Sequence, residues 1–154
     1  MFVGNILPLL YQDEAVLLVG LYCAIITPMT KKILIVEDET DIREAIAETL
    51  TDEGFVVLTA GNGMEGLEKA VAEHPDLILL DIMMPQMNGH EMLEKLRTDP
   101  DPWGRSVKVM MLTSMDTPKD VVGAYKQTIS DYIIKSHHSL EEIVAKVKVV
   151  IFQD

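Results

Sequence analysis

The chain has 154 residues, of which 48% are apolar and 25% are charged, and 13 Lys and Arg against 25 Asp and Glu give a net charge of −12. This length suggests one domain, the apolar fraction excludes a disordered acidic tail, and the acidic balance argues against nucleic acid as a partner. The one cysteine, Cys23, cannot form an internal disulfide, so the fold must rest on a packed core, as expected in the reducing cytoplasm.

The first 28 residues differ in composition from the rest. They hold 19 apolar residues and two charged ones, whereas residues 29–154 carry a net charge of −10. Their longest charge-free run, 15–30, has 16 residues, fewer than the roughly 20 of a membrane-spanning helix. No cation precedes Lys31, although a secretory signal begins with a basic region.

Two interpretations of residues 1–28 follow. The one we favour is an upstream stretch that is translated because the start was placed too early, with Met29 as the true start. The other is a short segment that contacts a membrane, with Lys31 and Lys32 facing the cytoplasm.

From residue 29 onward, short apolar runs alternate with segments of helical periodicity. The apolar runs predict five strands, at 32–37, 55–60, 76–81, 107–113 and 132–134. Between them the periodicity predicts helices over 38–53, from Gly63 to Pro75, over 89–97 and from Thr117-Pro118. A loop at 98–106 is expected after the third of these helices. Ser139 and Glu142 have the spacing of a capping box and predict the start of a last helix.

The third apolar run lacks polar alternation, which is typical of a parallel strand buried on both faces. Five alternating β and α units predict an α/β fold, a doubly wound five-stranded parallel sheet with helices on both faces. We expect residues 29–154 to form this single domain, with no output domain attached. In such sheets, ligands bind beyond the carboxyl ends of the strands.

Polar residues stand where four of the strands end. Glu37 and Asp38 end the first, Asp81 the third and Thr113 the fourth, and Lys135 follows the fifth, so we expect all of them to face one crevice. Three uncompensated carboxylates would repel one another and raise at least one pKa, so the cluster fits a bound cation. Oxygen ligands with room for water favour Mg²⁺.

With such a cation in place, Asp81 can attack phosphorus as a nucleophile and form an aspartyl phosphate. Mg²⁺ would hold one phosphoryl oxygen, the Thr113 hydroxyl would donate to a second, and the Lys135 ammonium would pair with a third. These strand-end residues therefore predict a phosphoryl-accepting site.

The sequence resembles the receiver domain of two-component response regulators over about residues 30–151. The matching stretches are 33–39, 79–89, 111–114 and 131–135, and the most specific feature is Asp81 followed by Met-Pro and then by Gly89, eight residues on. The resemblance implies a flavodoxin-like sheet of strand order 2-1-3-4-5. It also implies a protein that is not a conventional enzyme, although it promotes its own phosphorylation and dephosphorylation.

The resemblance assigns roles to individual residues. Asp81 would be the phosphoacceptor for a sensor histidine kinase or phosphotransfer protein. Glu37, Asp38, Asp81 and the backbone carbonyl of Met83 would form the Mg²⁺ shell, directly or through water. Thr113 and Tyr132 would be the switch pair that alters the face from the fourth to the fifth helix, where a downstream protein of unknown identity binds. The alternative is a degenerate receiver that binds partners without phosphorylation.

The chain departs from the family pattern at a few positions. Ser136 replaces the proline that usually follows the lysine through a cis peptide, so this bond is expected to be trans or strained. Thr128 replaces a glycine before the switch tyrosine. Met83 and Met115 lie two residues after Asp81 and Thr113, and their apolar side chains offer no hydrogen bond to an attacking water, which suggests a long-lived phosphoryl group.

Overall fold

The computed structural model describes residues 30–114 and 128–153, and those from Lys31 onward belong to one compact unit. They contain one sheet of five parallel strands in the order β2-β1-β3-β4-β5, which confirms the predicted sheet and its order. Each strand lies within one residue of its predicted bounds: β1 (Lys32–Val36), β2 (Val56–Ala60), β3 (Leu77–Asp81), β4 (Lys108–Thr113) and β5 (Asp131–Ile134).

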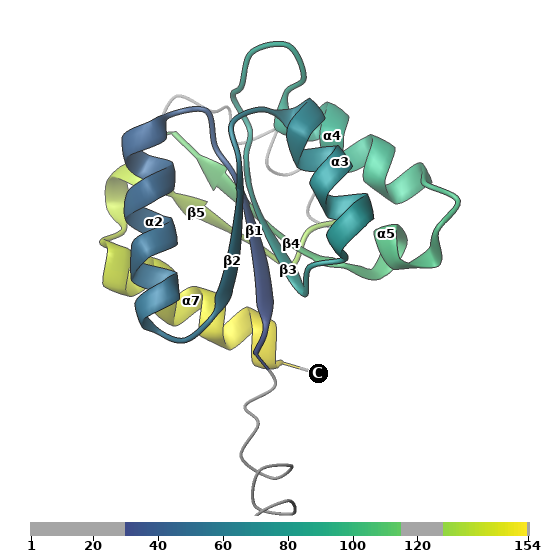
Figure 1. Cartoon of the computed structure of the whole chain (residues 1–154). Helices are drawn as coiled ribbons and strands as arrows, with labels where there is room; N and C mark the ends of the chain where they lie inside the picture. The colour runs from purple at the N-terminus through teal and green to yellow at the C-terminus, as the bar shows by residue number, and fades with distance from the viewer. Residues whose placement is uncertain (1–29, 115–127, 154) are drawn as a thin grey trace, which may run out of the picture. The chain divides into compact units, whose positions relative to one another are not determined.

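Helices cover both faces of the sheet (Figure 1). On one face lie α2 (Thr40–Asp52) and α7 (Leu140–Phe152), and on the other lie α3 (Gly63–Glu73), α4 (Gly89–Thr98) and α5 (Pro102–Ser106). The helix predicted from Thr117-Pro118, the residue Met115, and both interpretations of residues 1–28 lie outside the described residues. None of the described helices combines the length and the apolar character needed to cross a membrane.

The sheet separates two apolar cores. Because successive side chains of a strand point to opposite faces, Leu77 and Leu79 of β3 join the core under α2 and α7, while Ile78 and Leu80 join the core under α3 and α4. All residues of β3 are buried, as the absence of polar alternation predicted. The central strand is therefore fixed from both sides, and the position of Asp81 at its end is fixed with it.

Side-chain caps define where several helices begin. The capping box predicted from Ser139 and Glu142 is present at the start of α7, and Asn88 and Glu91 form another at the start of α4. The prediction of a loop over 98–106 was wrong in part, because α5 lies within it. Asp101 accepts a hydrogen bond from the Trp103 amide, and proline at the first helical position has the backbone angle that a helix needs.

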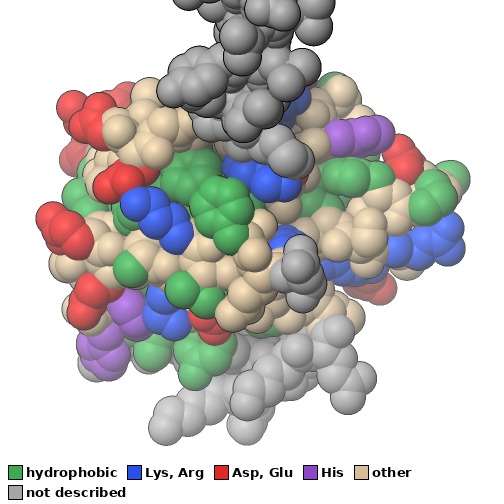
Figure 2. Space-filling view, turned by 90° about the horizontal axis from the view of Figure 1, so that it is seen from below, with side chains coloured by type: hydrophobic (Ala, Val, Ile, Leu, Met, Phe, Trp, Pro, Cys, Tyr) green, Lys and Arg blue, Asp and Glu red, His purple; other side chains and the backbone are tan. Residues whose placement is uncertain are grey.

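The amino ends of the strands lie at the lower end of the sheet in Figure 1. Lysines there hold neighbouring segments together: Lys31 Nζ lies 2.9 Å from Asp76 Oδ1, and Lys32 Nζ lies 3.0 Å from Glu73 Oε2. Figure 2 views this end, where hydrophobic side chains lie beside those of Lys and Arg. The carboxylates named in the sequence analysis follow the opposite ends of the strands.

Candidate functional site

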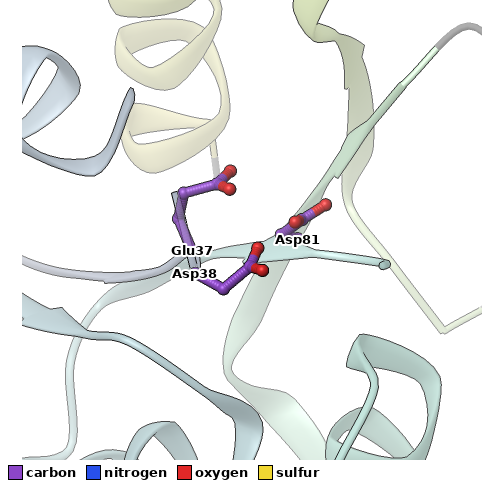
Figure 3. Close-up of side chains that lie close together, drawn as sticks. All are labelled: Glu37, Asp38 and Asp81. Carbon is purple, nitrogen blue, oxygen red and sulfur yellow. The ribbon is translucent and has the colours of Figure 1, made fainter. Parts of the chain in front are cut away.

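Three carboxylates meet at the carboxyl ends of β1 and β3. Glu37, Asp38 and Asp81 each offer an oxygen atom, and these oxygens all lie within 4.8 Å of one another (Figure 3). Glu37 and Asp81 are buried, whereas Asp38 is only partly so. The central strands place the three groups together because β1 and β3 are paired neighbours and their ends lie side by side.

The Lys135 ammonium bridges the two buried carboxylates. Its Nζ lies 2.8 Å from Glu37 Oε2, 3.1 Å from Glu37 Oε1 and 3.3 Å from Asp81 Oδ2. Lys135 begins a short 3₁₀ helix, η1 (Lys135–His137), and the peptide bond to Ser136 is trans, which decides between the two expectations for that bond. The lysine thus reaches the carboxylates through a trans peptide.

Burial perturbs the ionisation of all three of these groups. It raises the pKa of Glu37 to about 7, an effect that the Lys135 hydrogen bond opposes and the charge of Asp81 reinforces. Burial likewise raises the pKa of Asp81 above its ordinary value, while Lys135 opposes the shift. For Lys135, burial alone would lower the pKa, but the hydrogen bond to Glu37 and the charge of Asp81 raise it. Burial thus disfavours the ionised forms of Glu37 and Asp81, which a bound cation would favour.

The donor set fits a hard divalent cation. Three carboxylates supply oxygen ligands, and the partial exposure of Asp38 leaves access for water, which Mg²⁺ retains in protein sites. Glu37, Asp38 and Asp81 are the residues that would hold the ion. A role for the Met83 backbone carbonyl stays a prediction. The Met83 amide donates to Asp81 Oδ1 at 3.3 Å, so this backbone already orients the carboxylate.

The two residues expected to form the switch lie on β4 and β5, and Leu112, the residue before Thr113, pairs with Asp81 in the sheet. Thr113, the last residue of β4, is buried, and its hydroxyl donates to the Ser114 carbonyl at 2.9 Å. Tyr132 lies on the edge strand β5 and is 38% exposed. The described structure thus has the hydroxyl engaged with its own backbone and the aromatic ring at the surface.

Gly89 allows the loop after β3 to pass close to Asp81. A Cβ atom at position 89 would lie 2.1 Å from the Asp81 carbonyl oxygen, and the Gly89 amide donates to the Ile82 carbonyl at 3.0 Å. The glycine eight residues after the aspartate is therefore required by this close approach. It begins α4 directly beside the site.

Arg43 is a site residue that the sequence analysis missed. Its Nη1 donates to the Glu37 carbonyl at 2.6 Å and to the Asp38 carbonyl at 3.4 Å, which fixes the backbone that carries both carboxylates. One signal was available in the sequence. Cations are unfavourable in the first turn of a helix, so an arginine near the start of α2 suggests a specific contact.

Comparison with known proteins identifies the kind of domain that carries this site. The family model described as response regulator receiver domain matches residues 33–148. The alkaline phosphatase synthesis transcriptional regulatory protein PhoP of Bacillus subtilis is 37% identical over 123 residues, which are 80% of this chain and 49% of that protein. Hybrid signal transduction histidine kinase D of Dictyostelium discoideum is 41% identical over 115 residues, 75% of this chain and 7% of that protein.

Solved structures show the same fold. The chemotaxis response regulator CheY4 of Vibrio cholerae is 28% identical with a TM-score of 0.71, and the match covers 79% of this chain and 99% of that one. The N-terminal domain of a response regulator receiver protein from Methanoculleus marisnigri is 34% identical with a TM-score of 0.62, over 80% of this chain and 98% of that one.

The chain spans about half the length of several curated relatives, which are named as transcriptional regulators. These names give no support to the argument from net charge against a nucleic-acid partner, which stays a prediction.

Proposed function

This chain belongs to the response regulator receiver domain family, and on that premise we propose that Asp81 accepts a phosphoryl group from a sensor histidine kinase or a phosphotransfer protein. The observation that carries the proposal is the buried Asp81 carboxylate, which has Lys135 Nζ at 3.3 Å and two further carboxylates beside it. The Asp81 carboxylate is therefore shielded from water, and the Lys135 ammonium beside it can pair with an oxygen of the incoming phosphoryl group.

The transfer is a displacement at phosphorus. An Asp81 oxygen forms a bond to phosphorus, the bond from phosphorus to the donor nitrogen breaks, and the leaving imidazole keeps the electron pair. Glu37, Asp38 and Asp81 would hold Mg²⁺, which would supply positive charge to the phosphoryl oxygens. Lys135 pairs with a second oxygen, in exchange for part of its contact with the carboxylates.

Thr113 and Tyr132 change conformation when Asp81 is phosphorylated. The Thr113 hydroxyl leaves the Ser114 carbonyl and donates to the phosphoryl group, and the exposed Tyr132 ring turns inward. The changed face includes β5 and α7, and a downstream protein binds to it. We expect the chain to act in the cytoplasm as a signalling domain and not as a conventional enzyme.

Chemical phosphorylation tests the assignment of Asp81. Wild type and Asp81→Asn are incubated with Mg²⁺ and acetyl phosphate, and intact mass is measured. We expect one phosphoryl group on the wild type and none on Asp81→Asn, because the amide is not a nucleophile. Asp76→Asn, at the opposite end of the sheet, is the matched control and should label like the wild type.

Two results would contradict the proposal. Equal labelling of wild type and Asp81→Asn would place the phosphoryl group elsewhere. No labelling of either protein would favour a binding module that works without phosphorylation.

A further inference from the structure

Arg97, in the last turn of α4, joins three segments that lie apart in the sequence. Its guanidinium donates to the Gly104 carbonyl at 2.6 Å, to the Val107 carbonyl at 3.0 Å, and to the Thr128 carbonyl at 2.7 and 3.3 Å. These acceptors belong to α5, to the residue before β4, and to the segment that leads into β5. A guanidinium offers its donors in one rigid plane, so it holds several carbonyls at set positions, which an ammonium does not.

The opposite end of α4 lies against the phosphorylation site. Gly89, its first residue, is so near the Asp81 carbonyl that a Cβ atom would come within 2.1 Å of that oxygen. The helix has ten residues, begins with a complete capping box, and buries its apolar side against the sheet. It is therefore a rigid connection between Asp81 and Arg97.

The segment that Arg97 holds continues directly into β5. After Thr128, Ile129 packs against the core under α3 and α4, and the Ser130 amide donates to the Val109 carbonyl at 2.7 Å. β5 then begins, with Tyr132 as its second residue. The backbone position of Tyr132 thus depends on how residues 128–130 are anchored.

We propose that Arg97 is a positioning residue: it fixes residues 128–130 to α4 and so sets how Tyr132 responds to a phosphoryl group on Asp81. This inference rests on the proposed function of those two residues. The Arg97 guanidinium binds backbone carbonyls remote from the carboxylate cluster, so its replacement should leave phosphorylation of Asp81 intact and alter the response of Tyr132.

Fluorine NMR distinguishes an effect on the response of Tyr132 from an effect on the phosphorylation of Asp81. Arg97→Lys keeps the charge and loses the planar fork, and Arg105→Lys, at an exposed arginine on α5, is the matched control. The proteins carry 3-fluorotyrosine, Tyr132→Phe identifies the Tyr132 resonance, and acetyl phosphate with Mg²⁺ is added. We expect equal labelling of Asp81 by intact mass in all three proteins.

The Tyr132 resonance is expected to shift fully in the wild type and in Arg105→Lys, and about two-fold less in Arg97→Lys. A full shift in Arg97→Lys would overturn the proposal, because the response would then not depend on the guanidinium.

Amide hydrogen exchange tests the anchoring without any phosphorylation. In Arg97→Lys the Ser130 amide should exchange about ten-fold faster than in the wild type, because hydrogen bonds from a charged donor to the adjacent segment are lost. Amides of β3 should be unchanged, which shows that the variant is folded. Equal Ser130 exchange in both proteins would overturn the positioning role. If the wild type is not labelled on Asp81, the proposed function fails, and exchange alone decides the role of Arg97.

Discussion

Glu37 is the residue that links the candidate site to pH. Its pKa is raised to about 7, and a carboxylate must be ionised to bind a metal ion. Ionisation rises from about a tenth at pH 6 to about nine-tenths at pH 8, so we expect Mg²⁺ affinity to rise about ten-fold over that range. Calorimetric titration at several pH values measures this, and Glu37→Gln should bind more weakly with little dependence on pH.

The same shift affects the stability of the metal-free protein. The folded-state pKa of Glu37 lies above its ordinary value of 4.5, so its contribution to stability is full below pH 4.5 and is lost as the pH rises through about 7.

A flat Mg²⁺ affinity between pH 6 and pH 8 in the wild type would contradict the predicted pH dependence of binding, because it would show that Glu37 is already ionised without the metal.

We expect Met83 to affect how long a phosphoryl group on Asp81 survives. Its side chain is 65% exposed, two residues after Asp81, and cannot hydrogen-bond an attacking water. We expect Met83→Asn to speed the loss of the phosphoryl group several-fold, and combination with Met115→Asn to speed it further. Decay is followed by intact mass after removal of acetyl phosphate. Met64→Asn, at another exposed methionine, should decay like the wild type, and an unchanged rate in Met83→Asn would refute the idea.

At the residue scale, the sequence predicted which groups would meet but not how they would pair. Strand ends placed Glu37, Asp38, Asp81 and Lys135 at one edge of the sheet. That Lys135 contacts Glu37 more closely than Asp81 depends on side-chain conformation, which leaves no pattern in the sequence. The contacts of Arg43 and Arg97 were also missed, because most of their acceptors are backbone carbonyls, which every residue has.

At the scale of elements, α4 depends on a single small residue at its start. In Gly89→Ala the new Cβ would lie 2.1 Å from the Asp81 carbonyl oxygen, so the backbone of the loop or of β3 must move. We expect a loss of about 3 kcal/mol in the free energy of unfolding, near the upper end for overpacked sites.

Denaturant unfolding measures this loss, and Gly61→Ala is the control. Its nearest neighbour, Arg43 Nη1, would lie at an ordinary 3.6 Å, so we expect a change within about 0.5 kcal/mol. Similar stabilities for the two variants would mean that the backbone of the loop after β3 moves at little cost in free energy.

The elements were predicted well where the apolar pattern was strong. All five strands and the helices of the described residues with clear periodicity were found, because their core residues repeat at fixed spacings. α5 was missed because five residues containing proline and glycine have the composition of a loop. Its stability comes from the Asp101 cap and from Trp103, which packs on the core and stacks on His74 at 4.5 Å.

At the scale of the whole molecule, the sheet keeps its two cores apart. Ile46 belongs to the core under α2 and α7, and Ile78 belongs to the core under α3 and α4. Ile→Val at either site should cost about 1 kcal/mol. Because the two side chains lie on opposite sides of the sheet, the double variant should lose the sum of the single losses to within about 0.5 kcal/mol.

Denaturant unfolding of the single and double variants tests this additivity. Ile46→Val combined with Ile143→Val, in the same core, is the comparison, and there we expect the losses to depart from a sum. A large coupling between Ile46 and Ile78 would mean that strain passes through the strands.

Additive cores have an evolutionary consequence. A substitution under α2 and α7 would not change the cost of one under α3 and α4, so each face can acquire substitutions independently of the other. The surfaces that the helices of the two faces present to other proteins could then diverge at different rates, while β3 holds Asp81 in place between them.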